Sequence, residues 1–347
     1  MDTQIITNPS DQELDMLACA LRNGELVSIP TETVYGLGAN GLDPEAMDKI
    51  YIAKGRPSDN PLILHVPNSE SIKPLVTEVS NTAQLLMDTF WPGPLTITLP
   101  KSDLVPDRAT GGLPRVALRC PDHELCRALL ERAGVPIAAP SANISGRPSP
   151  TTAQDVYHDM KDRISYILDA GSCTIGVEST VVEVHDDKVI ILRPGGITKA
   201  QLEDVVSTVE YDTALVNATT KPKAPGMKYK HYAPKADMKL VRGNESDVSK
   251  YLKGQIKNSD RLTAVLTVDE HKDMFDTASS EKSNIKVLSL GSSKNPESIA
   301  YNLFDILRKC DELGVEYIFS ESFDERGIGK AIMNRLKKAA GFEIIDV

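Results

Sequence analysis

Residues 10–38, SDQELDMLACALRNGELVSIPTETVYGLG, contain the pattern of a helix, a tight turn and a buried strand in immediate succession. Ser10 and Glu13 have the spacing of a capping box, and apolar residues recur after them on one face of a helix. Gly24 is suited to end that helix, and the apolar run over 26–30 is typical of a buried strand. The stretch therefore predicts the start of an α/β domain.

The same alternation continues along the chain. Asp43 followed by Pro44 predicts the start of a second helix, which runs to Lys54. Short apolar runs predict strands, and helical patterns separate several of them. The strands are expected at 62–66, 95–99, 116–119, 135–139, 166–168, 180–184 and 189–192, and the helices at 81–90, 122–133, 152–162 and 199–206. We expect a mixed α/β class with a large twisted mixed sheet.

The pattern divides the chain into three segments. Residues 1–210 form the first domain, and residues 211–238 are rich in proline and lysine, which predicts a linker. Strand and helix signals alternate again over 239–347. Strands are expected at 239–241, 263–268, 285–288 and 317–320, and helices at 245–253, 296–313 and 328–340. This alternation predicts a small C-terminal Rossmann-like parallel α/β domain.

Charge and cysteine usage narrow the class of protein. The formal net charge of −10 and the pI near 5.2 argue against tight, sequence-independent binding of nucleic acid, which needs clustered Lys and Arg. The sequence has no signal-peptide pattern at its start and no apolar run of ~18 residues, so we expect no membrane association. Five scattered cysteines are typical of reduced thiols, which predicts a cytoplasmic protein.

Two local patterns resemble common motifs but lack what their chemistry needs. Residues 36–41, GLGANG, match G-x-G-x-x-G, yet the glycines do not join a predicted strand directly to a helix, so we predict no dinucleotide site. Cys120, His123 and Cys126 offer three metal ligands without an evident fourth, in a segment predicted to enter a helix. We therefore predict no metal site at this cluster.

Polar segments adjoin the ends of the predicted strands, where open α/β sheets place their ligand-binding groups. Lys54, Arg56, Arg119 and Arg193 lie next to apolar runs, and a buried cation needs an anionic partner, either a carboxylate of the protein or a ligand. Hydroxyl side chains surround Gly146. From the residues alone we predict an anion pocket. The segments are PTETVYGLG (30–38), KGRPSDNPLILH (54–65), PGPLT (92–96), RVALR (115–119), PSANISGRPSPT (140–151), ESTVV (178–182) and LRPGG (192–196).

The order of these segments closely resembles the YrdC-like family over residues 10–206. The segment 224–234, APGMKYKHYAP, and the predicted C-terminal domain are similar to the long, two-domain threonylcarbamoyl-AMP synthases. The resemblance implies a nucleotidyltransferase that condenses L-threonine, bicarbonate and ATP with Mg²⁺ into threonylcarbamoyl-AMP and pyrophosphate. It also implies that residues 1–210 are the catalytic domain, that the linker 211–238 is a lid over the active site, and that a downstream tRNA threonylcarbamoyl transferase complex is a partner. The net charge of −10 argues against tight direct binding of tRNA by this chain.

The resemblance also implies roles for single residues. The threonine-binding positions are Thr33, His65, Arg119, Ala139 and Ser179. The ATP-binding positions are Arg56, Asn60, Arg115, Ser141, Ser149, Arg193, Tyr229 and Tyr232. Lys54 and Arg56 are the expected catalytic residues, because a carbamate is already an anion and catalysis then rests on positioning and on neutralising phosphate charge. Arg115 departs from the family pattern, which has a small polar residue at that position.

Two other functions stay open from the sequence. A carbamoyl-transfer domain of hydrogenase maturation shares the core but also carries zinc-finger cysteines and an acylphosphatase-like domain, which this sequence lacks. A non-enzymatic RNA-binding or regulatory YrdC-like module would need a basic surface, which the net charge disfavours. The sequence does not predict a role for the C-terminal domain, the Mg²⁺ ligands or the oligomeric state.

Overall fold

The computed structural model describes residues 2–186, 188–213 and 231–347. The chain separates into two compact units, Met1–Ser145 with Ser149–Lys228 and Gly146–Pro148 with Tyr229–Val347. Most of the predicted linker lies outside the described residues, so the domain boundaries at 210 and 239 stay predictions. Among the described residues, no helix combines the length and apolarity needed to cross a lipid bilayer.

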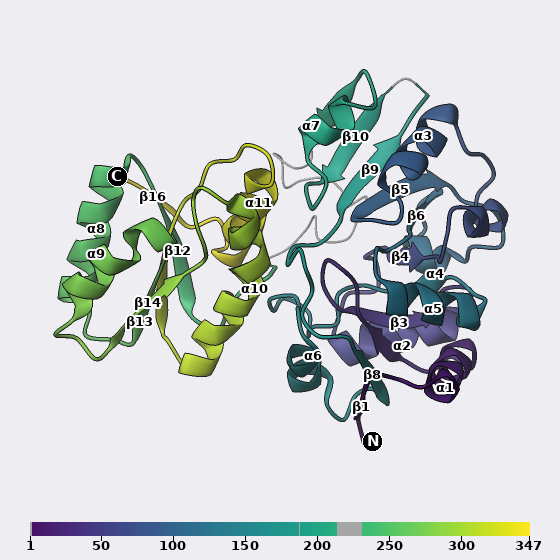
Figure 1. Ribbon diagram of the computed structural model, residues 1–347, viewed down its shortest axis with the longest axis horizontal. Coiled ribbons are helices and arrows are strands. Elements are labelled where there is room, and N and C mark those ends of the chain that lie inside the picture. The colour runs from purple at the N-terminus through teal and green to yellow at the C-terminus, as the bar shows by residue number, and fades with distance from the viewer. Residues whose placement is uncertain (1, 187, 214–230) are drawn as a thin grey trace. The chain divides into compact units, whose positions relative to one another are not determined.

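The described strands of the first unit form one mixed sheet (Figure 1). Neighbouring strands pair in parallel at β1–β8, β2–β8, β4–β6, β5–β9 and β10–β11, and the other pairs are antiparallel. In the order of the sheet, the strands are β1 (Gln4–Thr7), β8 (Tyr166–Asp169), β2 (Val27–Ile29), β3 (Gly36–Asn40), β7 (Ile137–Ala138), β4 (Ile63–His65), β6 (Arg115–Arg119), β5 (Leu95–Pro100), β9 (Thr180–Val184), β10 (Val189–Arg193) and β11 (Val209–Tyr211).

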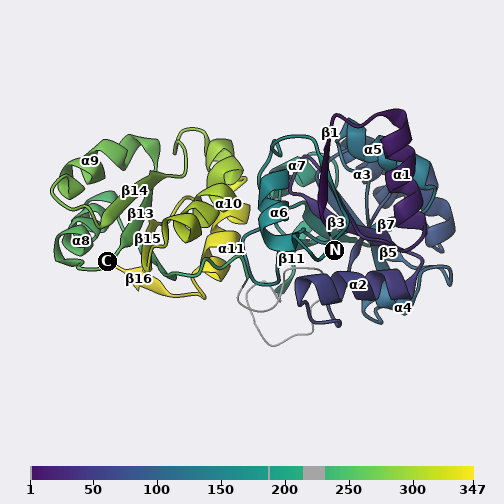
Figure 2. The same cartoon turned by 90° about the horizontal axis from the view of Figure 1, so that it is seen from below.

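Helices cover both faces of this sheet. Helices α1 and α5 share an apolar cluster with one face of β2, whereas α2 packs into the main apolar core on the other face (Figure 2). The helices of this unit are α1 (Asp11–Arg22), α2 (Pro44–Lys54), α3 (Asn81–Phe90), α4 (Asp107–Thr110), α5 (Glu124–Ala133), α6 (Ala153–Met160) and α7 (Lys199–Glu203), with a 3₁₀ helix at Glu70–Leu75.

Local sequence signals account for the ends of the first two helices. The capping box of Ser10 and Glu13 is present at the start of α1, as predicted. Asp43 caps α2, Pro44 occupies its first turn, and Gly55 ends it with a φ of 60°. These predictions are confirmed because capping depends on neighbours within one turn.

The glycine motif at 36–41 is part of a strand. Gly36 to Asn40 form β3, antiparallel to β2, so the glycines do not lead from a strand into a phosphate-binding helix. A Cβ atom on Gly38 would lie 2.9 Å from the carbonyl oxygen of Val27, and one on Gly41 would lie 2.8 Å from that of Pro136. The glycines therefore permit close approach of neighbouring backbone.

The second unit is a parallel sheet between two pairs of helices (Figure 1). Helices α8 and α9 lie on one side and α10 and α11 on the other, which is the doubly wound arrangement that the sequence predicts. The sheet order is β14 (Ile285–Ser289), β13 (Thr263–Thr267), β15 (Tyr317–Glu321), β12 (Asp237–Arg242) and β16 (Ile344–Asp346). The helices are α8 (Glu245–Asn258), α9 (Asp269–Ser279), α10 (Pro296–Leu313) and α11 (Gly329–Ala339).

Candidate active site

Alternation along the strands gathers polar side chains on one face of the first unit's sheet. In β6, Val116 and Leu118 belong to the main apolar core, which turns Ala117 and Arg119 to the opposite face. Ala117 lies there in a small apolar floor with Ile63, Val181 and Leu192. The same alternation adds His65 of β4 and Thr96 of β5 to this face.

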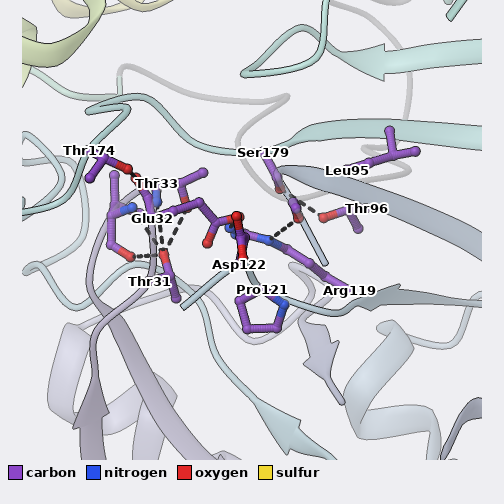
Figure 3. A network of polar contacts seen from close by, with 12 residues as sticks. Thr31, Glu32, Thr33, Leu95, Thr96, Arg119, Pro121, Asp122, Thr174 and Ser179 are labelled. Atoms are coloured by element: carbon purple, nitrogen blue, oxygen red, sulfur yellow. Dashed lines mark hydrogen bonds and ion pairs between the residues drawn. The ribbon is translucent and has the colours of Figure 1, made fainter. Parts of the chain in front are cut away.

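Arg119 forms a buried ion pair with Glu32 at the end of β6 (Figure 3). Arg119 Nη2 lies 2.7 Å from Glu32 Oε1, and the two side chains are only 5% and 6% exposed. Arg119 Nε also donates a hydrogen bond to the carbonyl oxygen of Gly93 at 3.3 Å. Glu32 is missing from the residues predicted from the sequence, although it lies within the quoted segment 30–38.

Ser179 connects the cation of Arg193 to the same network. The Ser179 hydroxyl lies 2.8 Å from the hydroxyl of Thr96, and both residues are fully buried (Figure 3). Arg193 donates from Nε and Nη2 to the carbonyl oxygen of Ser179, at 3.1 and 2.9 Å, and from Nη2 to its hydroxyl at 3.1 Å. A buried row of hydroxyls thus runs from Arg193 towards the strand that carries Arg119. Thr96 is a further residue that the sequence did not single out.

The segment 30–38 forms backbone hydrogen bonds with several other segments of the candidate site. The carbonyl oxygen of Glu32 accepts hydrogen bonds from the backbone of Thr174 and Ile175, and that of Thr33 accepts one from Gly176. The hydroxyl of Thr33 lies 2.9 Å from that of Thr31, which also accepts hydrogen bonds from the backbone. Tyr35 connects the segment 30–38 to the segment 140–151 through backbone hydrogen bonds with Pro150 and Ala142. Segments far apart in sequence therefore meet at this loop.

His65 is a neutral imidazole at the end of β4. Its side chain is buried, and burial, with the neighbouring charge of Arg119, lowers its pKa to about 3. Nδ1 lies 3.2 Å from the carbonyl oxygen of Ile63, which also accepts a hydrogen bond from the backbone of Ala139. His65 and Ala139 are thus held next to each other, and an uncharged imidazole suits recognition of a hydroxyl group.

Lys54 holds the loop that follows β7. Its ammonium group donates hydrogen bonds to the carbonyl oxygens of Ser141 and Asn143, the latter at 2.6 Å, and its own carbonyl oxygen accepts one from the backbone of Ser145. The side chain is only 2% exposed, so its charge lies buried against these carbonyl groups. The structure brings together Lys54 and Ser141, two of the predicted residues.

The loop of Arg56 and Asn60 is fixed by its own carbonyl groups. Arg56 Nη2 donates to the carbonyl oxygen of Pro61 at 3.2 Å, and the Tyr51 hydroxyl donates to that of Asn60 at 3.0 Å. Asn60 is buried, and its side-chain oxygen has no hydrogen-bond partner among the residues that the structure describes. Because buried acceptors are nearly always paired, this oxygen is suited to a donor on a ligand.

Ser149 pairs with a second buried carboxylate that the sequence did not single out. Its hydroxyl donates to Glu178 Oε1 at 2.7 Å, and both side chains are buried. Glu178 precedes Ser179 in the chain, so Ser149 lies close to the network of Arg193. Gly195 passes directly over this backbone, since a Cβ atom there would lie 2.3 Å from the carbonyl oxygen of Glu178.

Comparison with known proteins gives the family. Residues 19–195 match the family described as Telomere recombination, and residues 197–341 match the one described as Threonylcarbamoyl-AMP synthase, C-terminal domain. The chain is 46% identical over 337 residues to the threonylcarbamoyl-AMP synthase of Bacillus subtilis, covering 97% of this chain and 95% of that protein. It is 45% identical to that of Pyrococcus abyssi, covering 94% of each. The chain belongs to the threonylcarbamoyl-AMP synthase family.

A solved structure of the family agrees with the fold. The chain matches the crystal structure of P. abyssi Sua5 complexed with L-threonine with a TM-score of 0.91 and 43% identity, covering 99% of this chain and 100% of that one. Membership of the synthase family confirms the resemblance found in the sequence, and it favours the synthase reading over that of an RNA-binding module.

Arg115 lies at the other end of β6 from the network of Arg119. They are four positions apart, which is ~13 Å along a strand. Arg115 Nη2 donates to the carbonyl oxygens of Thr98 and Val184 at 2.8 Å, and partial burial lowers its pKa. It lines a pocket of about 250 Å³ with Glu78 and other residues. Its assignment to the ATP site of the synthase family stays a prediction.

Only one of the two tyrosines predicted to bind ATP is among the described residues. Tyr229 lies outside the described residues. Tyr232 belongs to the second unit, where it is 2% exposed and its ring stacks on Phe304 with a centroid distance of 5.2 Å. The Arg335 guanidinium lies 5.7 Å from the centre of the same ring. The predicted contact of either tyrosine with a nucleotide is untested.

His123 has a structural role within the synthase fold. Its Nδ1 accepts a hydrogen bond from the backbone of Cys126 at 3.3 Å and so caps α5, and burial lowers its pKa. Burial raises the pKa of the Cys120 thiol to about 11 and also raises that of Cys126. Protonated thiols are poor metal ligands, and over the described ranges no three His, Cys, Asp or Glu residues group as a metal site.

Proposed function

We propose that this chain synthesises L-threonylcarbamoyladenylate from L-threonine, bicarbonate and ATP, releasing pyrophosphate. Family membership supports this activity, since the relatives that cover the chain are threonylcarbamoyl-AMP synthases. The observation that carries the proposal is the buried Arg119, which is the register partner of His65 and lies in the same close-up as Thr33 and Ser179 (Figure 3), an arrangement suited to a small hydroxyamino acid. The P. abyssi relative, described as complexed with L-threonine, supports the same substrate.

Arg119 binds the carboxylate of threonine in this proposal. A guanidinium group at the end of a rigid strand can donate two parallel hydrogen bonds to a carboxylate. Thr33, Ser179 and the neutral imidazole of His65 supply hydroxyl and imidazole groups for the polar side chain of threonine. Ala139 contributes through its position beside His65, where its small side chain leaves room for the threonine methyl group.

Lys54, Arg56 and Arg193 surround the triphosphate. The neutral amine of threonine adds to bicarbonate with loss of water, or to CO₂ with loss of a proton, and so forms a carbamate. An oxygen of the carbamate then attacks the α-phosphorus, and the bond to the leaving pyrophosphate breaks. Because the carbamate is an anion, the reaction needs charge neutralisation more than a general base. Asn60, Ser141 and Ser149 complete the nucleotide site, and the buried oxygen of Asn60 accepts a hydrogen bond from the adenine or ribose.

Mg²⁺ fits this site as an ion held chiefly by the substrate. Mg²⁺ keeps several waters and needs few carboxylates when phosphates are present. The absence of a group of three metal-ligating side chains among the described residues is consistent with such an ion. Glu178, a buried carboxylate that accepts a hydrogen bond from Ser149 of the proposed nucleotide site, is the residue that would hold the ion. When bound, Mg²⁺ would neutralise charge on the phosphates.

The product fits a role in tRNA modification. Threonylcarbamoyl-AMP is a mixed anhydride that water hydrolyses, so a transferase complex that acts on tRNA must consume it promptly in the same compartment, the cytoplasm. The overall acidic charge favours handover of the adenylate over tight binding of tRNA by this chain.

The test is formation of the adenylate by the purified full-length chain. Pyrophosphate release should require L-threonine, bicarbonate and ATP together, and mass spectrometry should find threonylcarbamoyl-AMP. Omission of bicarbonate is the control for threonine-dependent hydrolysis of ATP. Pyrophosphate release that is independent of threonine would contradict the proposal.

A further inference from the structure

Glu32 is a buried carboxylate that neither the sequence motifs nor the proposed reaction assigns. It pairs with Arg119 at 2.7 Å, yet neither of its carboxylate oxygens, nor Arg119 Nη2, has a well-directed hydrogen bond among the described residues. A buried ion pair repays its desolvation only when hydrogen bonds satisfy the remaining atoms. The pair therefore retains hydrogen-bonding capacity that a ligand can use.

The backbone holds Glu32 in one orientation. Its carbonyl oxygen accepts hydrogen bonds from Thr174 at 3.1 Å and Ile175 at 2.9 Å, and the Thr31 hydroxyl accepts from the backbone of Thr33 and Val34 (Figure 3). The carboxylate thus meets Arg119 from a fixed loop, and Arg119 comes from a fixed strand. Such a pair is preorganised, so that neither charge must be reoriented when a ligand binds.

The Arg119–Glu32 pair and its neighbouring histidines carry no net charge. The neighbouring His65 is uncharged, since its pKa is lowered to about 3, and burial also lowers the pKa of His123. Arg119 and Glu32 then contribute one positive and one negative charge. A ligand that carries only a carboxylate would add an unbalanced negative charge to a buried site, which is costly. A zwitterion adds none.

We propose that Glu32 makes the amino-acid site selective for a zwitterion by fixing Arg119 and offsetting its charge. This inference rests on the proposed function, because it takes Arg119 as the partner of the substrate carboxylate. Glu32 is a positioning and specificity-determining residue, not one that transfers a proton. The site should therefore prefer L-threonine over the same molecule without its α-amino group, 3-hydroxybutyrate.

Two substitutions of Glu32 test the role of its charge separately from the role of its size. Glu32→Gln keeps the size and the acceptor oxygen but removes the negative charge, so that Arg119 is no longer balanced. The preference for L-threonine over 3-hydroxybutyrate should fall by about tenfold or more, the scale of one charged contact. Glu32→Asp keeps the charge and should retain the wild-type preference even if both ligands bind more weakly. Asp122→Asn is the matched control, since this carboxylate is 66% exposed and pairs with Arg127.

The measurement is calorimetric titration of the full-length chain with L-threonine, and displacement of threonine by 3-hydroxybutyrate. A lower preference in Glu32→Gln, with Asp122→Asn like the wild type, is the expected result. Equal weakening of both ligands in Glu32→Gln would show a merely structural role and overturn the inference alone. A wild-type chain that binds no threonine would instead overturn the proposed function, and this inference with it.

Discussion

His65 and Arg119 are register partners on the neighbouring parallel strands β4 and β6. This places a buried imidazole directly beside a guanidinium group, and no charge can be added to the imidazole without cost. Burial, together with the neighbouring charge of Arg119, keeps His65 neutral by lowering its pKa, so this residue contributes to the loss of stability in acid.

The first prediction concerns pH. The pKa of His65 is lowered from 6.5 to about 3, so unfolding takes up a proton between these values, and the free energy of unfolding falls as the pH drops through this range. Between pH 6.5 and about pH 5 this group should remove roughly 2 kcal/mol. His65→Gln should lessen that loss in urea unfolding, whereas replacement of the exposed His158 should not. Equal pH dependence in His65→Gln and the wild type would contradict this.

The second prediction concerns Lys54. Lys54→Met keeps most of the side-chain volume but removes the charge and the hydrogen bonds to Ser141 and Asn143. The rate of adenylate formation should fall by about 100-fold or more. Thermal stability should also fall, because the loop after β7 loses its hydrogen bonds to the Lys54 side chain. Lys49→Met is the control on the same helix, since Lys49 donates to the carbonyl oxygen of Gly24. Pyrophosphate release measures activity, and comparable losses in both variants would refute the assignment.

The third prediction concerns Tyr51, whose hydroxyl group supports the loop of Arg56 and Asn60, the loop that we propose binds ATP. Tyr51→Phe removes the hydroxyl that donates to the carbonyl oxygen of Asn60 at 3.0 Å. Loss of this bond should raise the KM for ATP by roughly tenfold, through a cost of about 1–1.5 kcal/mol, and leave the affinity for threonine unchanged. Steady-state kinetics measures the change in the KM for ATP, and titration with threonine measures the affinity for threonine. An equal weakening of ATP and threonine binding would contradict a role of this loop in ATP binding alone.

The fourth prediction concerns Gly195. A Cβ atom there would lie 2.3 Å from three backbone atoms of Glu178, Ser179 and Thr180. Because the backbone cannot yield as a flexible side chain does, Gly195→Ala should lower the free energy of unfolding by about 1–3 kcal/mol and weaken threonine binding. Gly254→Ala is the control: it has open space within α8 and should stabilise the protein by about 0.5–1 kcal/mol. Denaturant unfolding measures the free energy of unfolding of both variants. An unchanged value in Gly195→Ala would contradict the close approach of Gly195 to this backbone.

The elements that escaped sequence analysis lack strong periodicity. Among the described residues of α9, Phe275 alone is buried, so the helix shows no apolar stripe. β1 and β16 are short strands with little buried surface, and the glycines of β3 conceal its strand character. Longer elements with caps, such as α1 and α10, were predictable because their signals are local.

The sequence by itself determined the α/β alternation, the polar segments at strand ends and the family, because helical caps, strand periodicity and motif order are all readable within short windows. Only the tertiary structure decided that Glu32 meets Arg119, that Glu178 meets Ser149, and that Arg115 meets the carbonyl groups of Thr98 and Val184. These relationships depend on which strands are neighbours and in which register. Many registers would satisfy the apolar pattern of one strand, whereas the partner of a buried charge is fixed only when every strand of the sheet is in place.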